Sequence, residues 1–142
     1  MIEKDKQLLL VDLCGRLLYK PKALVNGHLA TILGIDENVV IVCIDGNDYK
    51  DETVVSADNN SDDVKPYLRP MSSMTEKEKH ELLRFGVVNL DMDNNAIDVC
   101  CVGFENHAKV QDYLNSIHVD YRGLFEKGLA IEITEENNPY EN

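Results

Sequence analysis

Apolar residues recur at helical spacing near the start of the chain. Leu9, Leu13 and Leu17 fall on one face of a helix, and Asp5 can cap its first turn. This pattern predicts a first helix over residues 5–18 with one apolar face.

After Pro21 the pattern changes to short apolar runs separated by turn residues. Asn-Gly and Asp-Gly pairs between the runs favour hairpin turns, because these residues tolerate positive φ. The run 39–44 is apolar at every position, which predicts a central strand covered on two sides. The expected strands cover residues 23–25, 28–35, 39–44, 53–56 and 64–68.

The second half of the chain has a different pattern, which opens on a segment with two prolines. Pro66 and Pro70 favour extended backbone, and Thr75 with Glu78 three residues later has the spacing of a capping box. The pattern then predicts a helix over 75–85, a hairpin of strands 87–92 and 96–102, a helix over 105–117, one or two helical turns within 120–128, and a closing strand over 129–133.

Together these elements predict an α+β fold. An N-terminal helix packs on a small curled antiparallel sheet or a Src-homology-3-like barrel, and a helix, a β-hairpin and C-terminal helices follow. We expect a subdomain over residues 1–70, a second subdomain over 71–134, and a flexible tail over 135–142. At 142 residues, the chain is long enough to bury a core without disulfides or a structural metal.

The formal charge of −12 limits the classes of partner. Residues 1–70 carry 8 basic and 12 acidic side chains, and residues 71–142 carry 6 and 14, so the second half is the more acidic. Because non-specific nucleic-acid binding depends on Lys and Arg displacing counterions, this balance disfavours direct binding to nucleic acid.

The N-terminus and the cysteines point to a cytoplasmic location. The first residues carry both charge signs and lead into only a short apolar run, which predicts neither a signal peptide nor a membrane span. Cys14, Cys43, Cys100 and Cys101 lack metal-ligand spacing and the density of a disulfide scaffold. We therefore interpret them as reduced thiols.

One acidic stretch partly matches a calcium loop. Asp91, Asp93 and Asn95 have the alternating ligand spacing, but Ala96 replaces the required glycine and Val102 replaces the bidentate glutamate. We predict a hairpin turn there rather than a cation site. A second acidic stretch, at Asp58, Asp62 and Asp63, is interpreted as a solvated loop tip.

Candidate catalytic groups are sparse. His28, His80, His107 and His118 include no pair at the i, i+4 spacing of a zinc helix. Cys43 with His28 could form a nucleophile and base across neighbouring strands, but apolar neighbours would raise the thiol pKa and keep it inert. We predict no catalytic residue, no cofactor and no metal.

Two tyrosine and arginine pairs are the candidate partner-binding residues. Tyr67, Arg69, Tyr121 and Arg122 combine rigid contact area with planar donor groups, and both residue types are enriched at binding hot spots. In the alternative, which we favour, each tyrosine fills the core and each arginine pairs with a carboxylate.

Two motifs carry a family resemblance. Residues 65–76 (KPYLRPMSSMTE) and 120–130 (DYRGLFEKGLA) resemble a group of small uncharacterised proteins from Bacteroides-type gut bacteria, their prophages and their phages. Residues 12–19 are similar to the start of those proteins. The resemblance implies a mobile-element origin, and it carries over no activity and no catalytic residue.

These observations lead to three hypotheses of function. The first is a non-enzymatic phage or mobile-element accessory protein that binds a bacterial protein partner, with a DNA-mimic inhibitor as an acidic variant. The second is a small-ligand binding or sponge protein that holds a nucleotide between the two halves. The third, an enzyme using Cys43 or Asp/His pairs, has no supporting motif.

Overall fold

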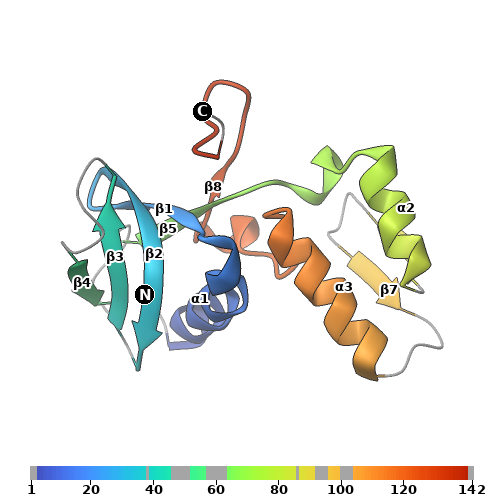
Figure 1. The fold of residues 1–142 in the computed structure, drawn as a ribbon, viewed down its shortest axis with the longest axis horizontal. Coiled ribbons are helices and arrows are strands. Elements are labelled where there is room, and N and C mark those ends of the chain that lie inside the picture. The colour runs from blue at the N-terminus through green and yellow to red at the C-terminus, as the bar shows by residue number, and fades with distance from the viewer. Residues whose placement is uncertain are drawn as a thin grey trace.

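The computed structural model describes the backbone of residues 3–37, 39–45, 52–56, 64–85, 87–91, 96–99 and 104–140, with side chains described for 3–37, 39–45, 64–85 and 108–140. The α+β class is confirmed (Figure 1). Helix α1 runs over Glu3–Arg16 and continues into a 3-10 turn, η1, over Leu17–Tyr19.

A mixed sheet forms one side of the molecule. Its strands lie in the order β4-β3-β2-β1-β5-β8, and every neighbouring pair is antiparallel except β5 and β8. Within the described residues β4 and β8 are unpaired edges, so the sheet is curled but does not close into a barrel. The strands are β1 (Lys22–Val25), β2 (His28–Asp36), β3 (Val39–Ile44), β4 (Glu52–Ser56), β5 (Val64–Leu68) and β8 (Ile131–Glu132).

Strand β8 is the expected closing strand, but it is two residues long. Tyr67 lies opposite Ile131 and Leu68 opposite Glu132 in a parallel register. The amide of Ile133 then donates to the carbonyl oxygen of Leu68 at 2.8 Å. The C-terminal part of the chain is therefore bonded to the sheet built by the first half.

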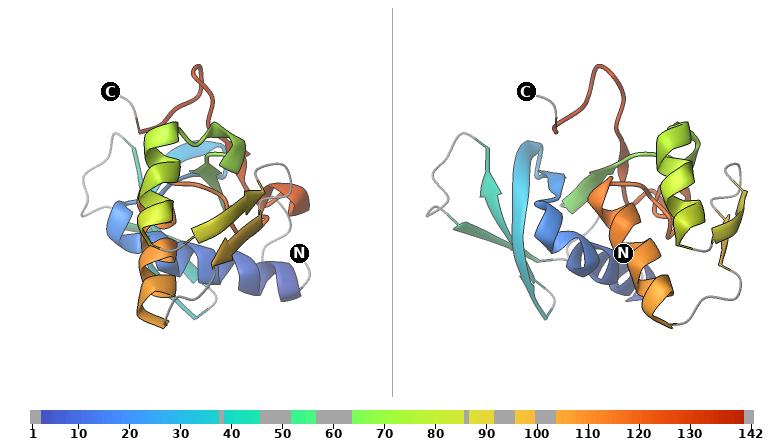
Figure 2. Two further views of the ribbon diagram at one scale, coloured as in Figure 1. Left: turned by 90° about the vertical axis from the view of Figure 1, so that its right-hand side faces the viewer. Right: turned by 45° about the vertical axis from the view of Figure 1, so that its right-hand side comes forward.

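The other side of the molecule is built by the remaining elements (Figure 2). The capping box is confirmed: the Glu78 amide donates to the Thr75 hydroxyl at 3.2 Å, and the Thr75 amide donates to the Glu78 carboxylate at 2.8 Å. These elements are η2 (Met71–Ser73), α2 (Glu76–Arg84), β6 (Val87–Asp91), β7 (Ala96–Val99) and α3 (Phe104–Ser116), whereas η3 (Phe125–Lys127) lies beside α1, where Lys127 pairs with Asp5.

Three apolar clusters hold these parts together. The first joins the apolar face of α1 to the sheet, and Leu13 and Val40 at its centre are fully buried. The second joins α2, α3 and the segment around η2. The third is small and joins β5 to the C-terminal part, because Leu68 packs with Leu124 and Leu129, and Leu8 of α1 packs against them. The second cluster consists of Met71, Met74, Leu82, Val110, Leu114 and Val119.

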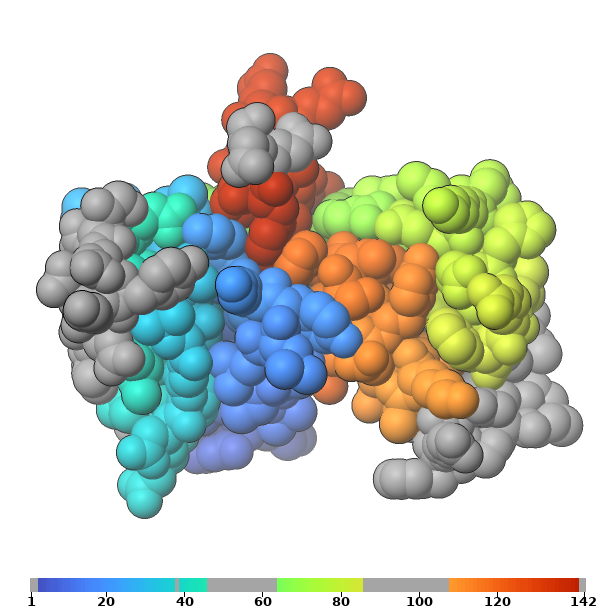
Figure 3. Space-filling view, in the orientation of Figure 1, coloured from blue at the N-terminus to red at the C-terminus, as the bar shows by residue number. Residues whose placement is uncertain are grey.

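The molecule has two lobes (Figure 3). The sheet lobe contains α1 and β1 to β5, and the helical lobe contains η2 to α3. Strand β5 leads from the sheet toward α2, and α1 contacts α3 (Figure 1). Residues 133–140, which we call the strap, rise between the lobes (Figure 3). None of the helices in the described part of the chain is long and apolar enough to cross a membrane.

Candidate functional site

A buried charge pair lies on α1 where the lobes meet. Asp12 and Arg16 are both 0 % exposed, and their i, i+4 spacing places them on one side of the helix. Arg16 Nε donates to one oxygen of Asp12 at 2.8 Å, and Arg16 Nη2 donates to the other at 3.0 Å. This two-point geometry is the strong form of an arginine and carboxylate pair.

Arg122 completes the cluster from the other end of the sequence. Its Nη1 donates to Asp12 at 2.9 Å, so one carboxylate holds two guanidinium groups. The Tyr121 ring lies beside both cations, with the Arg122 and Arg16 guanidinium carbons 4.6 and 5.5 Å from its centroid. Cation-π attraction adds to the charge pairing here.

Arg16 also binds the backbone of the helical lobe. Its Nη2 donates to the carbonyl oxygen of Val119 at 2.7 Å, which joins the end of α1 to the segment after α3. Its Nη1 is buried and has no hydrogen-bond partner. An unmet donor on a fully buried guanidinium costs free energy, so this atom is an exception within a well-paired cluster.

Gly15 allows the two lobes to approach closely. A Cβ atom added there would lie 3.2 Å from Asn115 Nδ2 and 3.6 Å from Arg122 Nη2. Asn115 is itself buried and accepts from the Tyr121 hydroxyl at 2.9 Å. Burial raises the Tyr121 pKa, and the two arginines only partly oppose this, so the phenol remains a donor near neutral pH.

Asp120 shapes the loop that carries Tyr121 and Arg122. Its carboxylate is 0 % exposed and accepts from the amides of Arg122 at 3.3 Å, Leu124 at 3.0 Å and Phe125 at 3.0 Å. The amide of Asp120 donates to the carbonyl oxygen of Arg69, and the Arg69 amide donates to that of His118. The loop is therefore fixed to the strand that joins the lobes.

Replacing Asp120 by alanine should cost about 2–3 kcal/mol of unfolding free energy, because the amides of Leu124 and Phe125 lose their acceptor in a largely buried setting. Urea denaturation followed by circular dichroism measures this loss. Asp120→Asn is the matched control, since it keeps one acceptor oxygen and should lose roughly half as much. A change within about 0.5 kcal/mol for Asp120→Ala would contradict this account.

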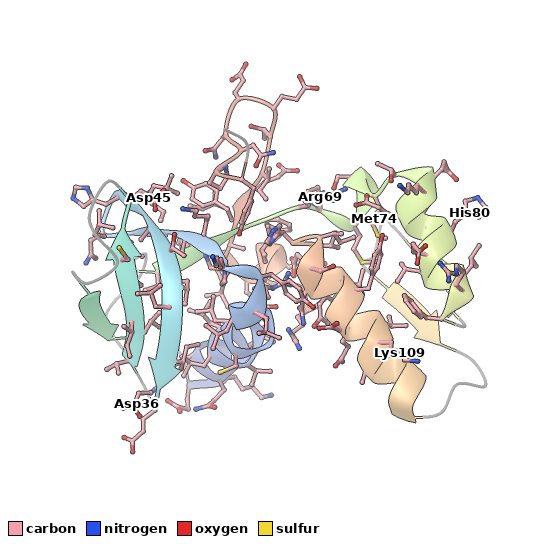
Figure 4. The ribbon with its side chains drawn as sticks, in the orientation of Figure 1. Asp36, Asp45, Arg69, Met74, His80 and Lys109 are labelled. Atoms are coloured by element: carbon pink, nitrogen blue, oxygen red, sulfur yellow. The ribbon has the colours of Figure 1, made fainter. Side chains whose placement is uncertain are left out.

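Arg69 lies between the lobes and is held by several partners (Figure 4). Its Nη1 and Nη2 each donate to the Glu78 carboxylate at 2.8 Å, and Nη2 also donates to the Ser73 carbonyl oxygen at 2.9 Å. The hydrogen bonds from Arg69 lower the pKa of Glu78, and the carboxylate raises the pKa of Arg69. This pair joins the end of β5 to the first turn of α2.

The four predicted binding residues thus lie on one connected region but are engaged within the chain. Tyr67 is 7 % exposed in the core, while Arg69 and Arg122 each pair with a carboxylate. Tyr121 lies between two guanidinium groups. Their binding role stays a prediction, because their described contacts are internal.

A second contact between the lobes involves the strap. The Tyr140 ring stacks on the His118 ring with centroids 3.7 Å apart and planes 14° apart. The Tyr140 hydroxyl oxygen accepts from the backbone amide of Lys22 at 2.7 Å. The segment predicted as a flexible tail over 135–142 therefore contains an anchored residue, and residues 141–142 lie outside the described part of the chain.

The exposed apolar residues are few, and two of them belong to the α1 and η1 segment. Val11 is 54 % exposed and Leu18 is 86 % exposed, and the exposed Cys14 lies between them at helical spacing. We call Val11, Cys14 and Leu18 the α1 stripe. Leu83 on α2, at 56 %, is the other exposed large apolar side chain of the described residues.

The remaining predicted features do not converge. Cys43 of β3 is buried opposite Thr31 of β2, whereas His28, the first residue of β2, is exposed and pairs with Val25 of β1. No group of three or more His, Cys, Asp or Glu side chains among the described residues could hold a metal ion. The side chains outside the described residues include Asp58, Asp62, Asp63, Asp91, Asp93, Asn95, Cys100, Cys101 and His107.

Comparisons with protein-family models, with curated proteins and with solved structures found no match to this chain. The site is therefore defined by its own geometry.

Sequence reasoning missed Asp12, Arg16, His118 and Tyr140. A signal for the first two was present, because an acid and a base four residues apart occur on the same turns as Leu9 and Leu13. No sequence pattern places His118 next to Tyr140, since their contact depends on the path of the strap.

Proposed function

We propose that this chain is a non-enzymatic accessory protein of a phage or mobile element that binds a bacterial protein partner in the cytoplasm. The observation that carries this proposal is the α1 stripe, which presents Val11 of α1 and Leu18 of η1 to solvent, while Asp12 and Arg16 of α1 are held by buried pairs. Rigid presentation of apolar side chains favours binding, because little conformational entropy is lost on docking.

The charge of the chain indicates the kind of partner. With 26 acidic and 14 basic side chains, the protein carries a negative field that attracts a positively charged surface. The proposed partner therefore presents an apolar patch surrounded by basic residues. Its association rate should fall as salt concentration rises, because screening weakens long-range attraction.

Replacing Leu18 by glutamate should weaken partner binding about 30-fold or more, the effect typical of a central apolar contact. The measurement is affinity capture of the tagged protein from Bacteroides lysate, followed by titration of the recovered protein against each variant. Leu83→Glu is the matched control, because it adds the same charge at another exposed leucine, on the other lobe.

Loss of the same recovered protein with Leu18→Glu, and its retention with Leu83→Glu, would support the proposal. Equal recovery with both variants would contradict a docking role for the α1 stripe. A co-purified nucleotide without any stoichiometric protein would instead favour the small-ligand hypothesis.

A further inference from the structure

The place that Tyr140 occupies has the features of a binding site. It consists of the His118 ring and the backbone amide of Lys22, and we call it the Tyr140 seat. The ring stacks at 3.7 Å and the hydroxyl oxygen accepts at 2.7 Å, so both the flat face and the polar edge of the phenol are recognised. Burial raises the Tyr140 pKa to about 12, which keeps the phenol neutral.

The seat contains an unmet polar atom. His118 Nδ1 is buried without a hydrogen-bond partner. Arg16 Nη1, which also lacks a partner, belongs to the guanidinium that donates to the carbonyl oxygen of Val119, the residue after His118. Buried polar atoms without partners are uncommon in folded proteins, and they often mark a place where a further group binds.

The backbone around the seat is also specialised. His118 has φ of +62°, a left-handed conformation that is uncommon for a residue other than glycine. Lys22 lies one residue before the pairing of β1 with β5 begins at Ala23 and Pro66, so Tyr140 provides the acceptor for an amide at the start of the strand. Strained backbone conformations cluster at binding sites. The Lys22 amide, whose acceptor is a side chain and not a neighbouring strand, is a donor that a ligand can use.

The strap has few anchors besides Tyr140. Glu135, Glu136 and Asn137 are exposed, and the Tyr140 amide donates to Asn138 Oδ1 at 2.9 Å within the strap itself. Tyr140 connects this segment to the lobes through the ring stacking and the Lys22 hydrogen bond, and at the other end the Ile133 amide donates to the carbonyl oxygen of Leu68. The strap therefore resembles a tethered ligand more than part of the core.

We propose that the Tyr140 seat is a binding site for a tyrosine side chain, occupied in the free protein by the chain's own Tyr140, and that a tyrosine presented by a partner protein can replace it. The ligand class follows from the contacts. A flat ring is required for stacking on His118, and an oxygen at its far edge is required to accept from Lys22.

The test uses Tyr140→Ala in the full chain with p-cresol, the side chain of tyrosine, as the probe. We expect p-cresol to bind Tyr140→Ala saturably, to raise its Tm and to shift the His118 ring signals in NMR spectra. It should bind the wild type only at much higher concentration, because there it must first displace Tyr140. Toluene, which lacks the oxygen, should bind roughly 2- to 10-fold more weakly, the effect of one hydrogen bond.

The protonation of His118 provides a second readout. Burial, with the charges of Arg16 and Arg69, lowers its pKa from 6.5 to about 4. Removing Tyr140 should raise this pKa toward 6.5, because the ring gains water, and p-cresol should lower it again. A rise that p-cresol does not reverse would overturn the proposal.

Equal binding of p-cresol to the wild type and to Tyr140→Ala would also overturn it, because the probe would then bind elsewhere. Tyr140→Phe covers the case in which the alanine variant does not fold. It keeps the stacking and loses the acceptor, so p-cresol should displace its ring at lower concentration than in the wild type. No difference between these two proteins would contradict the proposal. Neither result depends on the α1 stripe.

Discussion

Replacing Asp12 by alanine is expected to lower the free energy of unfolding by about 3–5 kcal/mol, the loss typical when one partner of a buried ion pair is removed. Asp12 is the shared acceptor of two guanidinium groups, and Arg16 is fully buried. Without the carboxylate, Arg16 keeps its charge in a site that water does not reach. The penalty comes mainly from this unpaired charge.

Urea denaturation measures the loss, and Arg122→Ala is the matched comparison. The Arg122 side chain is 17 % exposed, so removing it leaves Asp12 paired with Arg16 and should cost less than removing Asp12. A triple variant, Asp12→Leu with Arg16→Met and Arg122→Met, should recover much of the stability, because apolar replacement of a whole buried charge cluster is often neutral or favourable. Equal losses for Asp12→Ala and Arg122→Ala would contradict the shared-acceptor interpretation.

Leu68→Ala should cost about 2–5 kcal/mol, the range measured for truncating fully buried leucines. Leu68 is 0 % exposed and packs with Leu124 and Leu129, so it connects β5 to the C-terminal part of the chain. The cavity would lie in the small cluster that joins β5, α1 and the C-terminal part. Circular dichroism and thermal scanning measure this loss.

Leu83→Ala is the control for this second prediction. Leu83 is 56 % exposed, so its truncation should change stability by no more than about 0.5 kcal/mol. A change within about 0.5 kcal/mol for Leu68→Ala as well would contradict the role given to this cluster.

The internal pairing of charges bears on how the chain presents a binding surface. Asp12, Arg16, Arg69, Glu78 and Arg122 all form described contacts within the chain. Such pairs fix orientation, since a charged group that lacks its buried partner is costly. In the proposed function they hold α1 at a set angle to the helical lobe, and the α1 stripe then projects from a rigid base.

Much of the secondary structure followed from local sequence. The strands over 39–44 and 64–68 were predicted with the observed bounds, and the capping box at Thr75 and Glu78 formed as its spacing predicted. These features depend on residues a few positions apart. Their conformational preferences favour the same local structure whether or not tertiary contacts have formed. The first helix begins at Glu3 rather than at Asp5, a difference within the usual uncertainty of helix ends.

The candidate site was less predictable, because its contacts join distant residues. Arg122 and Asp12 are 110 positions apart, and Tyr140 and Lys22 are 118 apart. The sequence did mark Tyr121 and Arg122 as residues able to form strong contacts, but it left open whether a partner or the chain itself supplies them. The contacts described here come from the chain itself.

The sequence by itself determined the α+β class, the change from strands to helices near Thr75, and the acidic charge of the molecule, since these depend on local patterns and composition. The tertiary structure alone decided that the sheet stays open, that β8 joins it in parallel, and that Asp12 binds two arginines. It also decided that Tyr140 lies against His118. The physical reason is that burial and charge pairing depend on the residues that surround a side chain. Here those neighbours come from segments that are distant in the sequence and meet only in the folded chain.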